Sequence, residues 1–229
     1  MTHEELRDLV PITGKTGPHP TEQTSAHPHD VAFDPRGRFC LIPDKGLDAV
    51  FVFRVDEGGK LVPARPASVA SRPGAGPRHA GFHPTGPFAY VLNELDSTLT
   101  TYRFDADSGA LEPRQTITTL PPAFTGRNTT SEIAVAPSGR FVYASNRGHD
   151  SIVVFAMEPA TGTLRPVGWE PTQGKTPRFI GLDPAGAALY AANQDSDTIV
   201  AFRVDQQSGT LTPTGQVVAV GSPSTIVFR

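Results

Sequence analysis

Ionisable residues of different types stand at matching positions in four similar stretches of the chain. Six residues before a turn proline stand His29, Arg78, Ser131 and Arg178, and the residues that follow them are Asp30, His79, Glu132 and Phe179. Further along, one residue after an Asp or Asn, stand Lys45, Glu94, Arg147 and Gln194. Side chains that only pack would repeat from copy to copy, so this variation indicates binding or catalysis.

The charges at these positions favour an anionic ligand. Four of the residues are cations, namely Lys45, Arg78, Arg147 and Arg178. Excess positive charge in a concavity costs electrostatic free energy unless an anion fills it, so we expect a pocket for a phosphate or a carboxylate. The alternative is structural: Arg78 and Arg178 would pair with carboxylates of neighbouring sheets, and Glu94 would be the partner of Arg78.

The four stretches are copies of one repeat. Their turn prolines recur at intervals of 49, 53 and 47 residues, at Pro35, Pro84, Pro137 and Pro184, and a fifth copy begins at Pro223. Each copy contains four short runs of β-branched and aromatic residues, separated by turns with Gly and Pro. A period of about 50 residues built from such runs is typical of a β-propeller blade, a sheet of four antiparallel strands.

The repeat also predicts where the ionisable residues lie. In an antiparallel hairpin, the start of the first strand and the end of the second strand lie at the same end of the sheet. If the first strands line a central channel, as in propellers generally, the two sets of positions form two rings around one mouth of that channel.

The predicted fold is all-β: a single β-propeller domain over residues 1–229, with a loop and start region at 1–27 and blades at 28–229. The repeats account for four blades and one strand of a fifth, so we expect the C-terminal portion of a longer propeller. An open arc leaves apolar blade faces uncovered at both ends. Self-association through uncovered blade edges is therefore also expected.

Composition narrows the class of protein. The chain has 38% hydrophobic residues, 22 Gly and 23 Pro, which indicates a folded protein rich in turns. Its net charge of −3 and the lack of a long apolar run favour neither nucleic acid nor a membrane as partner. Cys40 is the one cysteine, and no signal peptide is evident, so a cytoplasmic location is predicted. Complete P-loop, nucleophile-elbow and metal-ligand patterns are missing, so no cofactor and no metal is expected.

Four segments carry longer motifs: HPHDVAFDP (27–35), GPRHAGFHPTGPFAYVLNEL (76–95), FVYASNRG (141–148) and TPRFIGLDPAG (176–186). They resemble the lactonase family of seven-bladed β-propellers, which includes propeller-type 6-phosphogluconolactonases and the fungal 3-carboxy-cis,cis-muconate lactonizing enzyme. The resemblance covers about residues 14–229, and it makes this chain a partial seven-bladed propeller that lacks about three blades. It implies a metal-independent cleft for an anionic sugar lactone or muconolactone. The residues that match the family's active-site positions are His29, Arg78, Glu94 and Arg147.

The resemblance also implies roles for these residues in lactone hydrolysis, which needs an activated water and a stabilised oxyanion. Glu94, or His29 if its imidazole is neutral, is the candidate general base. Arg147 or Arg78 would stabilise the oxyanion. The candidate substrate-binding residues, which would hold a remote phosphate or carboxylate, are Arg178, Lys45 and His79.

Three functions are therefore open at this point. The first is a lactonase that hydrolyses a sugar lactone such as 6-phosphogluconolactone in the pentose phosphate pathway. The second is a muconate-type cycloisomerase, in which the same base would act on carbon. The third is a non-catalytic propeller that presents a face to a protein partner.

Overall fold

The computed structural model describes residues 8–228, which form sixteen β-strands in four antiparallel sheets. The first sheet contains β1 (Ala32–Phe33), β2 (Phe39–Asp44), β3 (Ala49–Val55) and β4 (Leu61–Ala70). The second contains β5 (Pro77–Phe82), β6 (Phe88–Asn93), β7 (Thr98–Phe104) and β8 (Leu111–Thr118). The third contains β9 (Thr129–Val135), β10 (Phe141–Arg147), β11 (Ser151–Met157) and β12 (Leu164–Pro171). The fourth contains β13 (Pro177–Leu182), β14 (Ala188–Asn193), β15 (Thr198–Val204) and β16 (Leu211–Ala219).

The predicted all-β fold of four-stranded antiparallel blades is confirmed. Within each sheet the strands follow one another in chain order, so each copy of the repeat is one blade. Residues 8–27 of the predicted start region contain no strand, and residues 1–7 lie outside the described part of the chain. Within residues 8–228, no helix has the length and apolar character needed to cross a membrane.

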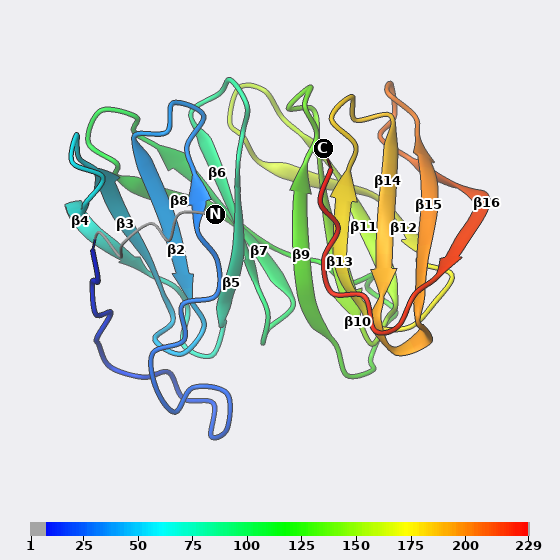
Figure 1. The fold of residues 1–229 in the computed structure, drawn as a ribbon, viewed down its shortest axis with the longest axis horizontal. Helices are drawn as coiled ribbons and strands as arrows, with labels where there is room; N and C mark the ends of the chain where they lie inside the picture. The colour runs from blue at the N-terminus through cyan, green and yellow to red at the C-terminus, as the bar shows by residue number, and fades with distance from the viewer. Residues whose placement is uncertain (1–7, 229) are drawn as a thin grey trace, which may run out of the picture.

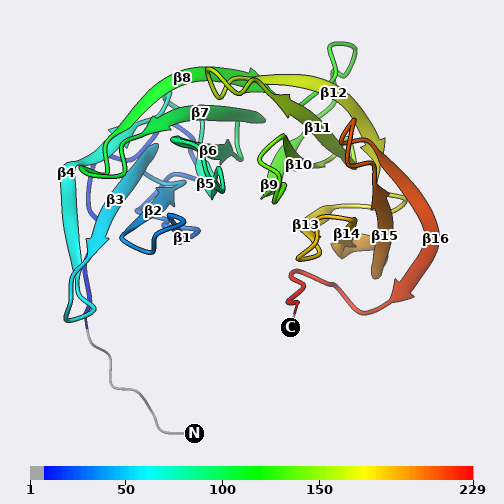
Figure 2. The ribbon, with the colours of Figure 1, turned by 90° about the horizontal axis from the view of Figure 1, so that it is seen from above.

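The four blades stand side by side in an arc (Figures 1 and 2). Figure 2 shows the first strand of each blade (β1, β5, β9 and β13) on the concave side, and the fourth strands on the convex side. The first strands therefore line the inside of the arc, which is where the repeat predicted the ionisable residues.

Each pair of neighbouring blades encloses a hydrophobic core. Leu41 of the first blade and Phe104 of the second belong to one core, and Tyr90 of the second blade and Phe155 of the third belong to the next. Phe202 belongs to the equivalent core between the third and fourth blades. Because blades pack face to face through repeated residues, successive first strands present equivalent positions to the concave side.

The outer face of the first blade is covered, whereas the sequence predicted uncovered apolar faces at both ends of the arc. The buried residues on the free face of the first blade are Cys40, Ile42 and Phe53. They are covered by Val10 and Ile12 of the start region, which pack against them. The expectation of an uncovered face is therefore wrong for the first blade, although Val31 and Phe33 beside it are 53% and 55% exposed.

The predicted strand of a fifth blade, residues 223–228, carries no assigned strand. It runs beside β13 (Figures 1 and 2), and the ring of Phe228 lies 5.5 Å from that of Tyr190. A β-strand needs a hydrogen-bonded neighbour, and no other described segment pairs with this one. Phe228 covers part of the apolar face at this end, whereas Val227 is 79% exposed. Apolar surface therefore stays accessible at this end, and self-association through it stays a prediction.

Candidate active site

Irregular strand pairing at the concave side sets the direction of the candidate side chains. In β5 the register with β6 shifts between Pro77 and His79, which leaves Arg78 as an extra residue. The register of β13 shifts in the same way around Arg178, and a similar shift in β9 includes Glu132. An extra residue bends the strand and re-aims a side chain that regular alternation would direct to a blade face. Proline suits such a site because it has no N–H to donate to the ladder.

Glu94 lies at the centre of a buried cluster of three cations. Its Oε2 lies 2.8 Å from Nε of Arg78, and its Oε1 lies 3.3 Å from Nη2 of Arg147 and 3.4 Å from Nζ of Lys45. The contact with Arg78 is an ion pair rather than a hydrogen bond, because the two groups are close but poorly aligned. These contacts match the structural alternative in which Glu94 is the partner of Arg78.

The charges around Glu94 make its carboxylate a weak base. Burial alone would raise the pKa of Glu94, but the charges of Arg147, Lys45 and Arg78 together outweigh burial, so the pKa lies below its ordinary value of 4.5. A carboxylate held so firmly in its ionised form accepts a proton poorly at neutral pH. Both oxygens of this carboxylate are also occupied by Arg78, Arg147 and Lys45, so Glu94 suits the holding of cations better than the role of general base.

The excess of positive charge around the candidate site is smaller than the sequence repeat predicted. Lys45 donates from Nζ to Oε2 of Glu22 at 2.7 Å, in addition to its contact with Glu94. Glu22 belongs to the start region, so an alignment of the repeats could not find it. Arg178 has no ion pair or side-chain hydrogen bond among residues 8–228, which leaves it as the cation that lacks a local partner.

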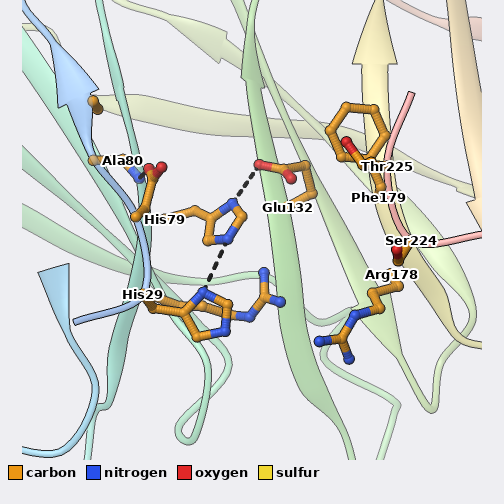
Figure 3. Close-up of a pocket in the computed structure, with 11 residues that line it drawn as sticks. His29, His79, Ala80, Glu132, Arg178, Phe179, Ser224 and Thr225 are labelled. Carbon is orange, nitrogen blue, oxygen red and sulfur yellow. Dashed lines mark hydrogen bonds and ion pairs between the residues drawn. The ribbon is translucent and has the colours of Figure 1, made fainter. Parts of the chain in front are cut away.

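A chain of hydrogen bonds joins Glu132, His79 and His29 from three successive blades (Figure 3). Oε1 of Glu132 lies 2.6 Å from Nδ1 of His79, and Nε2 of His79 lies 3.2 Å from Nδ1 of His29. Burial, followed by the charges of Arg78 and His79, lowers the pKa of His29 to about 4 from its ordinary 6.5. The imidazole of His29 is therefore neutral at neutral pH, which is the condition for its predicted role as a base.

His29, His79, Glu132 and Arg178 line one pocket of about 540 Å³ on the concave side. Figure 3 shows Arg178 across this pocket from His29, with its guanidinium directed into the space between them. Arg78 lines the same pocket. The pocket therefore combines a neutral imidazole, a buried arginine and an arginine without a local counter-ion.

Three further predicted residues lie behind or beside this pocket. Glu94 and Arg147 line a separate hollow of about 640 Å³, and Lys45 is 6% exposed and lines neither. The ion pair between Arg78 and Glu94 connects the two hollows, since each residue lines one of them. The structure thus brings the seven predicted residues into one region, divided between two spaces.

The sequence-based list of site residues left out Ser224 and Thr225, which also line the pocket (Figure 3). The repeat contains the signal that would have found them. Ser224 follows Pro223 as Arg78 follows Pro77, and Thr225 occupies the position of His79. Glu132 stands at one of the varied ionisable positions of the repeat but is not among the predicted site residues, because its contact with His79 depends on the packing of two blades.

Comparison with known proteins places the chain in a family. The sequence profile described as "Lactonase, 7-bladed beta-propeller" matches residues 2–228. The chain belongs to the seven-bladed β-propeller lactonase family. This lactonase-family chain is 37% identical to 6-phosphogluconolactonase of Bacillus subtilis over 166 residues, which cover 72% of the chain and 46% of that protein. It is 34% identical to 6-phosphogluconolactonase of Serratia proteamaculans, covering 64% of the chain and 44% of that protein.

A solved relative has the same architecture. The structure of the periplasmic gluconolactonase PpgL of Pseudomonas aeruginosa superimposes with a TM-score of 0.83 and 38% identity, over 90% of this chain and 58% of that one. The lactonase-family chain thus spans about half the length of the curated relatives it matches. The match to the family confirms the resemblance on which the predicted active-site positions depend.

Proposed function

We propose that this chain provides the catalytic pocket of a lactonase that hydrolyses an anionic sugar lactone, with 6-phosphogluconolactone as the preferred candidate. The observation that carries the proposal is the pocket in which a neutral His29 faces Arg78 and Arg178. The names of the Bacillus subtilis and Pseudomonas aeruginosa relatives support a lactone as the substrate class. The cytoplasmic location stays a prediction, since the Pseudomonas aeruginosa relative is named as periplasmic.

In the proposed reaction, His29 is the general base. Its Nδ1 is engaged by His79, which leaves Nε2 to take a proton from water. The hydroxide then attacks the lactone carbonyl carbon and forms a tetrahedral oxyanion. Collapse of this intermediate breaks the bond to the ring oxygen, which receives the proton back from His29 and leaves as the hydroxyl of the open acid.

Arg78 is the proposed oxyanion ligand. Its side chain is 3% exposed, lines the pocket, and is fixed by the ion pair with Glu94 and by donation from Nη1 to the backbone oxygen of Ser131. A donor that is already oriented and shielded from water stabilises a developing negative charge without reorganisation. In this proposal Glu94 orients Arg78 and Arg147, so its charge acts through the arginines.

Arg178 is the proposed anchor for the substrate's own anionic group, which would distinguish a phosphorylated from an unphosphorylated lactone. Arg178→Ala is expected to raise KM for 6-phosphogluconolactone about tenfold or more, the value of one charged hydrogen bond. The KM for gluconolactone, which lacks the phosphate, is expected to change less than about twofold, because the lost contact is to the phosphate. Steady-state hydrolysis of both lactones by the full chain measures this.

The matched control is Arg165→Ala, since Arg165 is an exposed arginine on β12 outside the pocket. It should leave both KM values unchanged. Equal effects of Arg178→Ala on the two lactones would contradict the anchoring role. Failure of the parent chain to hydrolyse either lactone above the spontaneous rate would contradict the proposed function.

A further inference from the structure

We propose that Glu132, His79 and His29 form a proton relay, in which Glu132 is a positioning residue that fixes both histidine tautomers and stabilises the charge delivered to His79. This inference deepens the proposed function and rests on it. The three residues are called the histidine relay below. They come from β9, β5 and the segment before β1, so the relay crosses two blade interfaces.

The contacts of the histidine relay give it a direction. The carboxylate of Glu132 only accepts hydrogen bonds when ionised, so the 2.6 Å contact puts a proton on Nδ1 of His79. A neutral His79 then has its lone pair on Nε2, which accepts the proton of His29 Nδ1 at 3.2 Å. The remaining ring nitrogen of His29, Nε2, is left with its lone pair as the proton acceptor.

The surroundings of the relay explain why His29 would need a second histidine. A proton held on His29 alone is disfavoured by burial and then by the nearby charge of Arg78, which hold the pKa of His29 at about 4. His79 instead contacts a carboxylate with a side chain 12% exposed. A positive charge on His79 would lie beside the carboxylate of Glu132, 2.6 Å from Nδ1, in a charge-assisted hydrogen bond.

The proton transfers balance. Nε2 of His29 takes a proton from water while Nδ1 of His29 passes its own proton to Nε2 of His79. His29 is neutral again, and the positive charge rests on His79 beside Glu132. After the ring oxygen leaves, the same transfers run in reverse and return one proton to it. Glu132 stays ionised throughout and touches no reacting atom.

The tautomers can be measured without any substrate. Nitrogen-15 NMR of the histidine side chains in the full parent chain at pH 7 should show His29 protonated at Nδ1 and bare at Nε2, and His79 protonated at Nδ1. Spectra of His29→Gln and His79→Gln assign the signals. A His29 that carries its proton on Nε2 would overturn the relay, whether or not the chain hydrolyses a lactone.

Kinetics give the second test. Glu132→Gln keeps the size of the side chain but removes the charge, and it should lower kcat for 6-phosphogluconolactone about 100-fold, as expected for the loss of an oriented base. KM should stay within about twofold, since Glu132 is not proposed to touch the substrate. Glu132→Asp, which restores a carboxylate, should recover part of kcat.

The matched control is Glu112→Gln, because Glu112 is an exposed glutamate on β8. It should leave kcat unchanged. An unchanged kcat in Glu132→Gln, or an equal loss in Glu132→Asp, would overturn the positioning role. If the parent chain hydrolyses no lactone, the proposed function fails, and the NMR measurement still decides whether the relay exists.

Discussion

Glu94 compensates the charges of three buried cations, a structural task that can be tested separately from catalysis. Glu94→Gln leaves Arg78, Arg147 and Lys45 buried together without the charge that compensates them, and removing one member of a buried ion pair costs about 3–5 kcal/mol. Urea unfolding of the variant at pH 7 should show a loss of this size. Glu112→Gln removes an exposed partner of Arg114 and should cost less than about 1 kcal/mol.

The loss of stability in Glu94→Gln should depend on pH in a direction that the pKa of Glu94 determines. The pKa of Glu94 lies below 4.5 in the folded chain, so the folded state binds fewer protons there than the unfolded state. The stability from Glu94 is therefore complete above pH 4.5 and disappears as the pH falls through the folded-state pKa. The difference between parent and Glu94→Gln should narrow on acidification, and a constant difference would contradict the charge-based explanation.

At the scale of single residues, the sequence repeat predicted the types and positions of the site residues better than it predicted their roles. It brought Arg78, Glu94 and Arg147 to one region because the spacing of the copies determines which positions are equivalent. It did not reveal that three cations share one carboxylate, since that depends on side-chain directions across blade interfaces. Nor did it show that both oxygens of Glu94 are occupied by cations while His29 keeps one ring nitrogen outside its contact with His79, because these contacts exist only in the folded chain.

At the scale of the strands and turns, the hairpin between β2 and β3 holds the segment that leads into the second blade. The turn residue Asp48 has φ of 49°, and its carboxylate accepts hydrogen bonds from the backbone N–H of Gly74 at 2.7 Å and of Gly76 at 2.8 Å. The equivalent residues, Ser97, Asp150 and Asp197, also have φ between 53° and 55°. The segment fixed by Asp48 leads directly into β5 and Arg78.

Asp48→Ala should therefore destabilise the chain by about 2–4 kcal/mol, because one buried and one partly buried N–H group lose a charged acceptor and alanine is strained at this φ. Asp48→Asn should lose less, since asparagine tolerates positive φ and keeps one acceptor oxygen. The matched control is Asp105→Ala, which removes an exposed aspartate that accepts two N–H bonds within its own turn. Urea unfolding measures all three, and equal losses for Asp48→Ala and Asp105→Ala would contradict a link between blades.

The strand pattern was predictable from the sequence, whereas the irregular pairing was not. Runs such as Val50–Phe53 and Ile152–Phe155 mark strands because β-branched and aromatic residues fit a pleated, half-buried surface. The extra residues at Arg78 and Arg178 arise from the register between two strands, which one strand's sequence does not contain. Both arginines line the pocket on the concave side. The irregular pairing is thus the least predictable feature of the fold, and the position of the two arginines depends on it.

At the scale of the whole molecule, the repeat predicted an arc of blades but not how its ends are covered. The residues that cover the first blade, Val10 and Ile12, precede the first copy and share no period with it. The lone cysteine, Cys40, lies fully buried beneath them and so reports on this cover. Burial also raises the pKa of the Cys40 thiol, which reduces the reactive thiolate further.

Ile12→Asp places a charge against this apolar face and should release the cover locally. Because the lost burial of an isoleucine amounts to about 1–2 kcal/mol, Cys40 should react with a thiol reagent roughly tenfold faster than in the parent chain. Leu9→Asp is the matched control, since Leu9 is 80% exposed and lies in the same segment, and it should leave the rate unchanged. If Cys40 of the parent already reacts as fast as an unfolded thiol, the first blade is not covered in solution. Its apolar face would then be free for the predicted self-association.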